Sequence, residues 1–360
     1  MLETITSKNY HESPFLSVII PSYNPTVVFD ECLASVAIAC RELPDQVEVY
    51  VIDDCSKEPF INRVESHGFH YVRMLQRSGA GATRNHGAQL ATGSILLFID
   101  YDVVVPPNSF KQVLDHFDND LQLTALSARP AIDNGIPGFF NAYKCLFSYN
   151  LFNRTPRNVC YIWTSFAAIQ TNAFHRAGGF ATHYKYAGWE DVEMGLSLSS
   201  LGYRIINTDL IEVTHKHHYN LKSLIKNDWK RVADYMKLLI HNRVIIRRLR
   251  CAGQFLQNHE KLSVPFSVLL LLDLLIAILS FDAILPRWIG IYCALAAPFL
   301  LLIFVLSLKD SIALAWRTHG AIFAMKSLLT SFALSNISAL AGILGLVMYL
   351  YGQSGDGDNA

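Results

Sequence analysis

Carboxylates cluster where apolar segments of the chain end. Asp53 and Asp54 lie at the end of VEVYVIDDCS, Asp100 and Asp102 lie at the end of SILLFIDYD, and a third segment, SVIIPSYN, also ends in polar residues. In open α/β sheets, ligands bind beyond the carboxyl ends of the strands, so we expect the four carboxylates to converge on one crevice. A divalent cation would offset their mutual repulsion. Hard oxygen ligands suit Mg²⁺ or Mn²⁺, and a bound diphosphate would complete the coordination sphere.

A glycine-rich segment, GAGATRNHG at residues 79–87, offers a second kind of chemistry. It opens a predicted helix, and the N-terminus of a helix attracts phosphate groups. It is not a P-loop, because no Gly-Lys-Ser/Thr follows, and Arg84 stands where a dinucleotide-binding G-x-G-x-x-G needs its last glycine. The pattern therefore disfavours a dinucleotide site and leaves contact with a phosphate or a nucleotide.

Two further groups carry acids or histidines. Glu190 and Asp191 begin a predicted helix in GWEDVE, where they either cap the helix, favoured by its dipole, or belong to a site. The segment His215-Lys216-His217-His218 follows a predicted apolar stretch, and clustered histidines can supply a metal ligand. For His215 a structural role and a ligand role both stay open, whereas a structural role is predicted for His217 and His218.

Strand and helix patterns alternate over the first part of the chain and would position these groups. Strands are predicted at 16–21, 47–52, 69–75, 94–99, 123–128 and 163–170, and helices at 29–41, 81–91, 108–117 and 190–201. Continuous apolar strands between helices indicate a mostly parallel sheet that is covered on both faces. The predicted fold class of this part is therefore α/β.

Three long apolar stretches follow residue 262, at 264–285, 288–308 and 328–351. Each exceeds the roughly 20 residues that a helix needs to span a bilayer. Buried helices of a soluble domain are the alternative, but the apolar residues surround each helix, which favours membrane spans. Asp273 and Asp282 interrupt the first stretch, and we expect Asp273 to face other helices or a polar cavity and Asp282 to reach the interface.

Charge patterning predicts the orientation of these spans. The segment 221–250 places apolar residues at helical spacing among basic ones, which indicates an amphipathic helix on the inner membrane face, with an ordinary surface helix as the alternative. Positive-inside reasoning predicts a cytoplasmic N-terminal part, three spans and a C-terminus on the far side, in the inner or plasma membrane if the protein is bacterial. The predicted division is an extension at 1–15, an α/β domain at 16–215, a basic juxtamembrane segment at 216–262, three transmembrane helices at 263–351 and a tail at 352–360.

Composition narrows the class of protein. Thirty basic residues balance 30 acidic ones in 360 residues, which argues against a nucleic-acid partner. The seven cysteines are scattered without a C-x-x-C pair, so we expect reduced thiols in the cytosol rather than a disulfide framework or a zinc site. Residues 1–15 lack the apolar stretch of a signal peptide, which again predicts a cytosolic N-terminal part.

Six short motifs, in order, resemble those of glycosyltransferase family 2. They are SVIIPSYN, VIDDCS, GAGATRNHG, FIDYD, AGGF and GWEDVEMGLSLSSLGYRI, and the resemblance covers about residues 16–215. It implies a GT-A fold, a Rossmann-like domain for nucleotide-diphospho-sugars, in a membrane-anchored member that inverts the anomeric carbon. Cys55 stands where glycine is common in the family, which changes little.

The resemblance also implies roles for individual residues. The nucleoside base would be lined by Pro21, Tyr23 and Asp54, with Arg84 beside it. The ribose, diphosphate and Mg²⁺ or Mn²⁺ would be held by Asp100 and Asp102, with Asp102 the more direct metal ligand and His215 a further candidate. Gly179 and its neighbours would lie near the donor sugar, Asp191 would be the general base, and Glu190 would hold acceptor or donor hydroxyls.

The expected reaction is transfer of one sugar from a UDP-, GDP- or dTDP-sugar to a hydroxyl of a membrane-associated acceptor. The Gln-x-x-Arg-Trp motif of processive synthases is missing around residues 227–231, which disfavours polymerisation. The aromatic segment 135–153 either helps to present the acceptor or belongs to the core. Three alternatives stay open: a polyprenyl-phosphate acceptor, an inactive nucleotide-sugar-binding membrane scaffold, and a nucleotidyltransferase.

Overall fold

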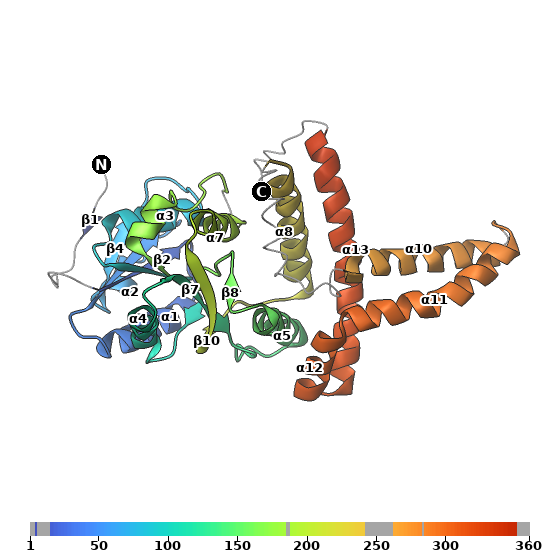
Figure 1. The fold of residues 1–360 in the computed structure, drawn as a ribbon, viewed down its shortest axis with the longest axis horizontal. Helices are drawn as coiled ribbons and strands as arrows, with labels where there is room; N and C mark the ends of the chain where they lie inside the picture. The colour runs from blue at the N-terminus through green and yellow to red at the C-terminus, as the bar shows by residue number, and fades with distance from the viewer. Residues whose placement is uncertain (1–3, 6–14, 185–187, 242–261, 283, 351–360) are drawn as a thin grey trace. The chain divides into compact units, whose positions relative to one another are not determined.

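The computed structural model describes residues 4–5, 15–184, 188–241, 262–282 and 284–350 (Figure 1). The chain divides into two compact units. The first comprises Met1–Ile136 and Thr155–His218, and the second comprises Pro137–Arg154 and Tyr219–Ala360. The segment predicted as one α/β domain, residues 16–215, is therefore not continuous, because residues 137–154 belong to the second unit.

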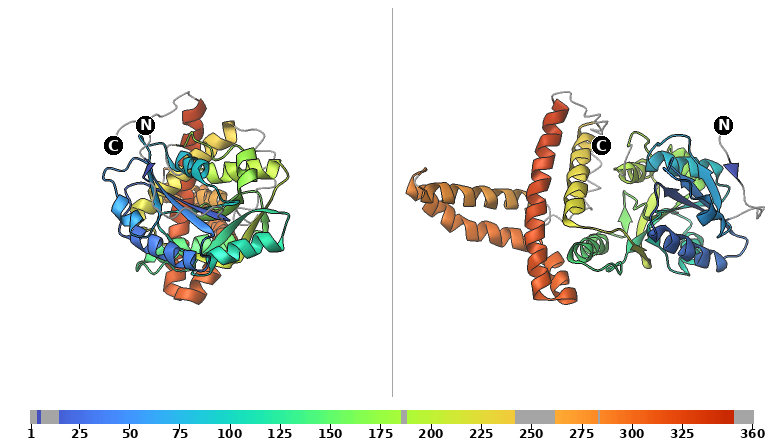
Figure 2. Two further views of the ribbon diagram at one scale, coloured as in Figure 1. Left: turned by 90° about the vertical axis from the view of Figure 1, so that its left-hand side faces the viewer. Right: turned by 180° about the vertical axis from the view of Figure 1, so that it is seen from behind.

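The first unit is built on one mixed sheet (Figures 1 and 2). Its strands are β1 (Thr4–Ile5), β2 (Leu16–Ser22), β3 (Val47–Asp53), β4 (His70–Arg73), β5 (Ile95–Ile99), β6 (Val103–Val104), β7 (Leu123–Pro130), β8 (Asn158–Val159), β9 (Phe166–Gln170) and β10 (Arg204–His215). Their order is β1-β4-β3-β2-β5-β9-β7-β10-β6, with β8 paired to β10. Strands β4, β3, β2 and β5 are parallel, whereas β9 runs antiparallel to both β5 and β7.

Helices cover both faces of this sheet, as the sequence predicts. They are α1 (Val28–Arg41), α2 (Ile61–Glu65), α3 (Ala80–Leu90), α4 (Ser109–Asn119), α6 (Thr171–Arg176) and α7 (Glu190–Ser200). Strand β2 is buried on both sides: Val18 and Ile20 join the core beneath α1, while Ile19 faces α3. Burial of each such side chain stabilises the fold by about 1.5–3 kcal/mol. Gly87 permits the close approach of α3, since a Cβ there would lie 2.5 Å from Ile19 Cγ2.

The predicted strands and helices of this unit are confirmed. The elements that were not predicted are β10, a helix of the second unit at Phe139–Arg154, and the short elements β1, β6, β8, α2 and α6. Strand β10 was not predicted because its register shifts between Thr208 and Glu212, where polar and exposed residues interrupt the apolar pattern. Helix α5 (Phe139–Arg154) was left as an aromatic segment, because apolar and polar residues alternate around it with little periodicity. The antiparallel direction of β9 was likewise not visible in its sequence.

The second unit is helical. It contains α5, α8 (Leu221–His241), α10 (Ser263–Phe281), α11 (Arg287–Ser307), α12 (Lys309–His319) and α13 (Ala321–Leu350). Among the described residues, three helices are long and apolar enough to cross a membrane: Ser263–Phe281, Arg287–Ser307 and Ala321–Val347. The first ends at Phe281, earlier than predicted. The third begins earlier than predicted, directly after Gly320, whose φ of 84° ends α12.

Helix α5 is held inside the second unit by polar contacts. Tyr143 Oη lies 2.9 Å from Ser331 Oγ of α13, and Asn150 Nδ2 donates to Ser311 Oγ of α12 at 2.8 Å. Arg154 Nη2 lies 2.6 Å from Asp310 Oδ2. Tyr143 is buried, and Phe139 packs against Phe323 with ring centroids 5.0 Å apart. These aromatic side chains therefore pack within the helical unit.

Helix α8 occupies the first part of the predicted amphipathic segment 221–250. Leu224 is buried in a cluster with Tyr143 and Leu334, while Lys222 and Lys226 are exposed. The rest of that prediction, residues 242–250, lies outside the described residues.

Candidate active site

Three parallel strands end together at one edge of the sheet. Ser22 of β2 pairs with Asp53 of β3, and the Asp54 amide donates to the Ser22 carbonyl at 2.8 Å. Strand β5 lies beside β2 in the same direction and leads directly into Asp100. The motifs at residues 53–54 and 100–102 therefore lie at one sheet edge, as the sequence predicts.

The four carboxylates do not all converge, which corrects the expectation for Asp53. Its side chain is fully buried and accepts hydrogen bonds from Tyr71 Oη at 2.6 Å and from the Ser56 amide at 2.8 Å. Arg73 Nη1 lies 3.6 Å from Asp53 Oδ2, the same oxygen that Tyr71 contacts. Burial raises the pKa of the Tyr71 hydroxyl above its usual range, and the hydrogen bond to the negatively charged Asp53 raises it further. Asp53 thus has a structural role inside the sheet.

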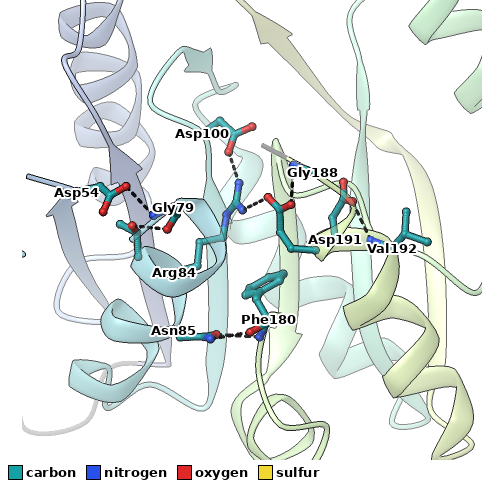
Figure 3. Close-up of polar contacts among 11 residues, drawn as sticks. Asp54, Gly79, Arg84, Asn85, Asp100, Phe180, Gly188, Asp191 and Val192 are labelled. Carbon is teal, nitrogen blue, oxygen red and sulfur yellow. Dashed lines mark hydrogen bonds and ion pairs between the residues drawn. The ribbon is translucent and has the colours of Figure 1, made fainter. Parts of the chain in front are cut away.

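Asp54 holds the loop that leads into α3. Its Oδ1 accepts from the Ser78 amide at 2.6 Å. Its Oδ2 accepts from the Gly79 amide at 2.9 Å (Figure 3). Gly79 has φ of 87°, in the left-handed region that favours glycine. The carboxylate therefore fixes the start of the glycine-rich segment.

The aromatic ring predicted to contact a base lies nearby. The Arg77 guanidinium stands 4.0 Å from the centroid of the Tyr23 ring. Pro21, the other residue predicted for the base, is buried in β2. Sequence reasoning missed Arg77, although it precedes the glycine-rich segment by two residues.

Arg84 is the central cation of this edge. Its Nη2 lies 2.7 Å from Asp100 Oδ1 and its Nη1 lies 3.2 Å from Glu190 Oε1 (Figure 3). The side chain is only 4% exposed. Burial lowers the pKa of Arg84, but the Asp100 and Glu190 carboxylates outweigh burial and raise it, so the guanidinium stays charged. Arg84 was predicted to lie beside the base, and the structure pairs it with these two acids.

Helix α3 is also fixed to the segment predicted to meet the donor sugar. Asn85 Nδ2 donates to the Phe180 carbonyl, and the Phe180 amide donates to Asn85 Oδ1, both at 2.8 Å (Figure 3). Gly179 has φ of 73°, and a Cβ there would lie 2.8 Å from Asn85 Oδ1. The glycine is therefore required both by its conformation and by the approach of Asn85, which sequence reasoning did not single out.

Asp100, Asp102 and His215 form a candidate metal centre. One ligand atom from each lies within 4.8 Å of the others. Antiparallel pairing of β6 with β10 sets Val103 opposite His215, which brings the imidazole to Asp102. His215 Nε2 lies 3.0 Å from Asp102 Oδ1. Two carboxylates and one imidazole form a donor set that fits a divalent cation.

His217, predicted to be structural, lies on the other oxygen of Asp102. The distance from His217 Nδ1 to Asp102 Oδ2 is 3.4 Å. Asn134, which is buried, donates from Nδ2 to the carbonyls of both His215 and His217. The signal in the sequence was the spacing of two residues, since alternate residues of an extended chain point to the same side.

Electrostatics keep the Asp102 carboxylate ionised. Burial alone would raise its pKa, but the two histidines outweigh burial and hold the pKa well below its usual range. The pKa of Asp100 is raised, because burial outweighs the opposing effect of Arg84.

Glu190 and Asp191 begin α7 and have different surroundings. Glu190 is 4% exposed and accepts from the Gly188 amide at 2.9 Å while it pairs with Arg84. Asp191 is half-buried, and its Oδ1 accepts from the Val192 amide at 2.8 Å (Figure 3). Glu190 is buried and paired with Arg84, whereas Asp191 is only partly buried. Asp191 is therefore the more accessible of the two carboxylates.

Several known glycosyltransferases are similar to part of this chain. A family model described as glycosyl transferase family 2 matches residues 17–178. An uncharacterized glycosyltransferase of Haemophilus influenzae is 35% identical over 101 residues, which cover 28% of this chain and 33% of that protein. Validoxylamine A glucosyltransferase of Streptomyces hygroscopicus subsp. jinggangensis is 26% identical over 263 residues, which cover 63% of this chain and 62% of that protein.

A solved structure supports the fold. The mannosyltransferase PcManGT of Pyrobaculum calidifontis, determined with GDP-Man and Mn²⁺, superposes with a TM-score of 0.52 at 18% identity and covers 98% of this chain and 91% of its own. The chain spans between about a third and three fifths of the curated relatives named above. The sheet, its helices and the family match agree, and the first unit has the GT-A fold. Residues 17–178, most of which lie in this unit, match the model of glycosyltransferase family 2, and this is the family that the chain resembles.

Proposed function

We propose that the protein transfers one sugar from a nucleotide-diphosphate sugar to a hydroxyl of a membrane-associated acceptor. The observation that carries the proposal is the convergence of the Asp100–Asp102–His215 cluster and the Arg84–Glu190 pair at one sheet edge. Three apolar helices on the same chain support an acceptor in or at a membrane. Transfer of a single unit is favoured because the motif of processive synthases is missing.

Asp191 is the proposed general base. A hydroxyl is a weak nucleophile, so a carboxylate must accept its proton as the new bond forms. Direct displacement by that oxygen inverts the anomeric carbon. Glu190 and Arg84 would orient the donor or acceptor hydroxyls beside it. A Mg²⁺ or Mn²⁺ ion at Asp100, Asp102 and His215 would stabilise the negative charge on the departing diphosphate.

The donor would lie along the sheet edge. Tyr23, Pro21 and Asp54 would contact the nucleoside base, and Gly179 would allow close approach of the sugar. The relatives support a nucleotide-linked donor, since PcManGT was determined with GDP-Man.

A polyprenyl phosphate is the second candidate acceptor. An undecaprenyl-phosphate 4-deoxy-4-formamido-L-arabinose transferase of Klebsiella pneumoniae is 30% identical over 112 residues, covering 29% of this chain and 33% of that protein. A phosphate acceptor is already ionised and would need no base. The accessible carboxylate of Asp191 therefore favours a hydroxyl.

We further place the catalytic unit on the cytoplasmic side, with the basic segment that includes α8 against the membrane surface. The Lys and Arg residues of α8 support this orientation.

The test uses membranes that contain the full chain. UDP-, GDP- and dTDP-sugars labelled in the sugar are supplied in turn with Mn²⁺ or Mg²⁺ and a native lipid extract, and label is followed into the organic phase. We expect one donor to label the lipid, and Asp191→Asn to lower turnover by about 10²–10⁴-fold while donor binding persists. Asp118→Asn, an exposed acid on α4, is the matched control and should change nothing.

Two results would overturn the proposal. Full activity of Asp191→Asn with a lipid product would exclude the base and favour the phosphate acceptor. Binding of a nucleotide sugar without consumption of any donor would favour the inactive scaffold.

A further inference from the structure

Helix α13 is bordered by α5 and α8 over most of its length. Phe323 packs on Phe139 of α5, Ser331 contacts Tyr143 of the same helix, and Leu334 lies in a cluster with Leu224 of α8. Further along, a Cβ at Gly342 would lie 3.7 Å from Val232 of α8. From Leu224 to Val232 and from Leu334 to Gly342 both chains advance together. Helices α8 and α13 therefore run side by side in the same direction (Figures 1 and 2).

Helix α8 cannot lie within hydrocarbon. Between its two contact points with α13 it carries Lys226, Asp228, Lys230 and Arg231. Lys144 of α5 adds an ion pair, with its Nζ 3.8 Å from Asp228 Oδ1. Ionised side chains at the centre of a bilayer are strongly disfavoured. The side of α13 that meets α5 and α8 must therefore lie at or above the level of the lipid headgroups.

The length of the bordered segment decides against a conventional span. Phe323 to Gly342 covers about 28 Å of helix, close to the hydrocarbon thickness of about 30 Å. If α13 crossed the bilayer, charged residues of α8 would be carried into its interior. The part of α13 beyond Gly342 extends only about 12 Å and is too short to span.

Helices α10 and α11 differ in each respect. They pack against each other as a hairpin, with Gly290 close to Ser280 near its tip, and their outward residues are apolar and exposed. The hairpin runs crosswise to α13 in Figure 1 and in the right-hand view of Figure 2. Immediately after α11, Asp310 and Ser311 contact Arg154 and Asn150 of α5. The open end of the hairpin is thus at a polar surface.

We propose that only the α10–α11 hairpin crosses the membrane, and that α13 lies in the plane of the membrane surface beside α8. The lipid bilayer is the partner of the exposed apolar side of α13, which carries Ile322, Met325, Leu329, Leu340 and Ile343. An even number of crossings returns the end of α13 to the side of the catalytic unit. This differs from the far-side C-terminus predicted from loop charge, and it does not depend on the reaction catalysed.

Protease protection in sealed, inverted membrane vesicles tests this topology. Three full-length proteins carry one epitope tag each: at residue 1, after Leu285 in the hairpin turn, or after residue 360. We expect the first and third tags to be digested and the hairpin tag to be protected until detergent is added. Protection of the third tag would overturn the proposal, as would digestion of the hairpin tag.

A measurement of depth tests the position of α13 directly. Spin labels are placed singly at Leu329, Leu340 and Val347 of the full chain, and their exposure to oxygen and to an aqueous quencher is compared. We expect the three labels to lie at similar, shallow depths. Labels at Leu269 and Ile278 of α10 are the control and should differ in depth, since about 13 Å of helix separates them. A steady change of depth from Leu329 through the bilayer centre to Val347 would overturn the proposal.

Discussion

At the scale of single residues, the site depends on one buried cation. Arg84 joins α3 to the end of β5 and to the start of α7 through Asp100 and Glu190. Removal of one partner from a buried ion pair leaves an uncompensated charge. The pairing explains why Glu190 is held in place beside Asp191.

We expect Arg84→Met to destabilise the protein by about 3–5 kcal/mol, because the buried Glu190 and the partly buried Asp100 would be left without their cation. Arg129→Met removes a more exposed pair with Glu212 and should cost about 1 kcal/mol or less. Thermal unfolding of the full chain in detergent gives the comparison. Equal losses of unfolding free energy in the two variants would show that the Arg84 ion pairs stabilise the protein no more than the exposed pair does.

The second prediction at this scale concerns the metal. Asp102→Asn should abolish detectable Mn²⁺ binding, because it removes the ionised carboxylate. His217→Phe should weaken binding by about 10–100-fold, the usual effect of losing a group that orients a metal ligand. Titration of the purified protein with Mn²⁺, followed by paramagnetic resonance, measures both, with Asp118→Asn as the control. Unchanged affinity in Asp102→Asn would exclude this metal centre.

At the scale of elements, strand β4 carries a buried histidine that makes stability depend on pH. His70 stacks on Tyr50 with ring centroids 4.9 Å apart, and burial lowers the pKa of its imidazole despite the opposing charge of Glu48. The unfolded chain then binds the proton more tightly than the folded one. The stability that neutral His70 contributes is therefore complete above the unfolded pKa, about 6.5, and is lost as pH falls through the folded pKa.

We expect the midpoint temperature of thermal unfolding to decrease when the pH is lowered from 7.5 to 5.5. The decrease should be smaller in His70→Phe, in which the phenylalanine ring still stacks on Tyr50. The difference between the two proteins isolates this residue from the other histidines. An identical fall in both would contradict the assignment.

The sequence predicts the strands and helices better than it predicts the side-chain contacts between them. Strands such as β2 and β5 were predictable, because their apolar runs end abruptly in polar motifs. The inward turn of Asp53 was not, since it depends on Tyr71 and Arg73 from the neighbouring strand. The pairing of Arg84 with Glu190 joins residues 106 positions apart and leaves no local signal.

At the scale of the whole molecule, one inserted helix links two kinds of structure. Helix α5 follows β7 in the catalytic unit but packs among α8, α12 and α13. Neither the periodicity nor the charge of its sequence indicated that α5 belongs to the helical unit. The apolar stretches, by contrast, predicted all three long helices, while the placement of α13 required its neighbours.

The products of the reaction test the central claim, that this site transfers a sugar from a nucleotide diphosphate. Membranes with the full chain are incubated with the consumed donor, labelled in the nucleotide, with and without the lipid extract. We predict release of the nucleoside diphosphate that depends on the lipid and is lost in both Asp102→Asn and Asp191→Asn. Release of pyrophosphate, which would indicate nucleotidyl transfer, or nucleoside diphosphate release unaffected by Asp102→Asn, would contradict the account.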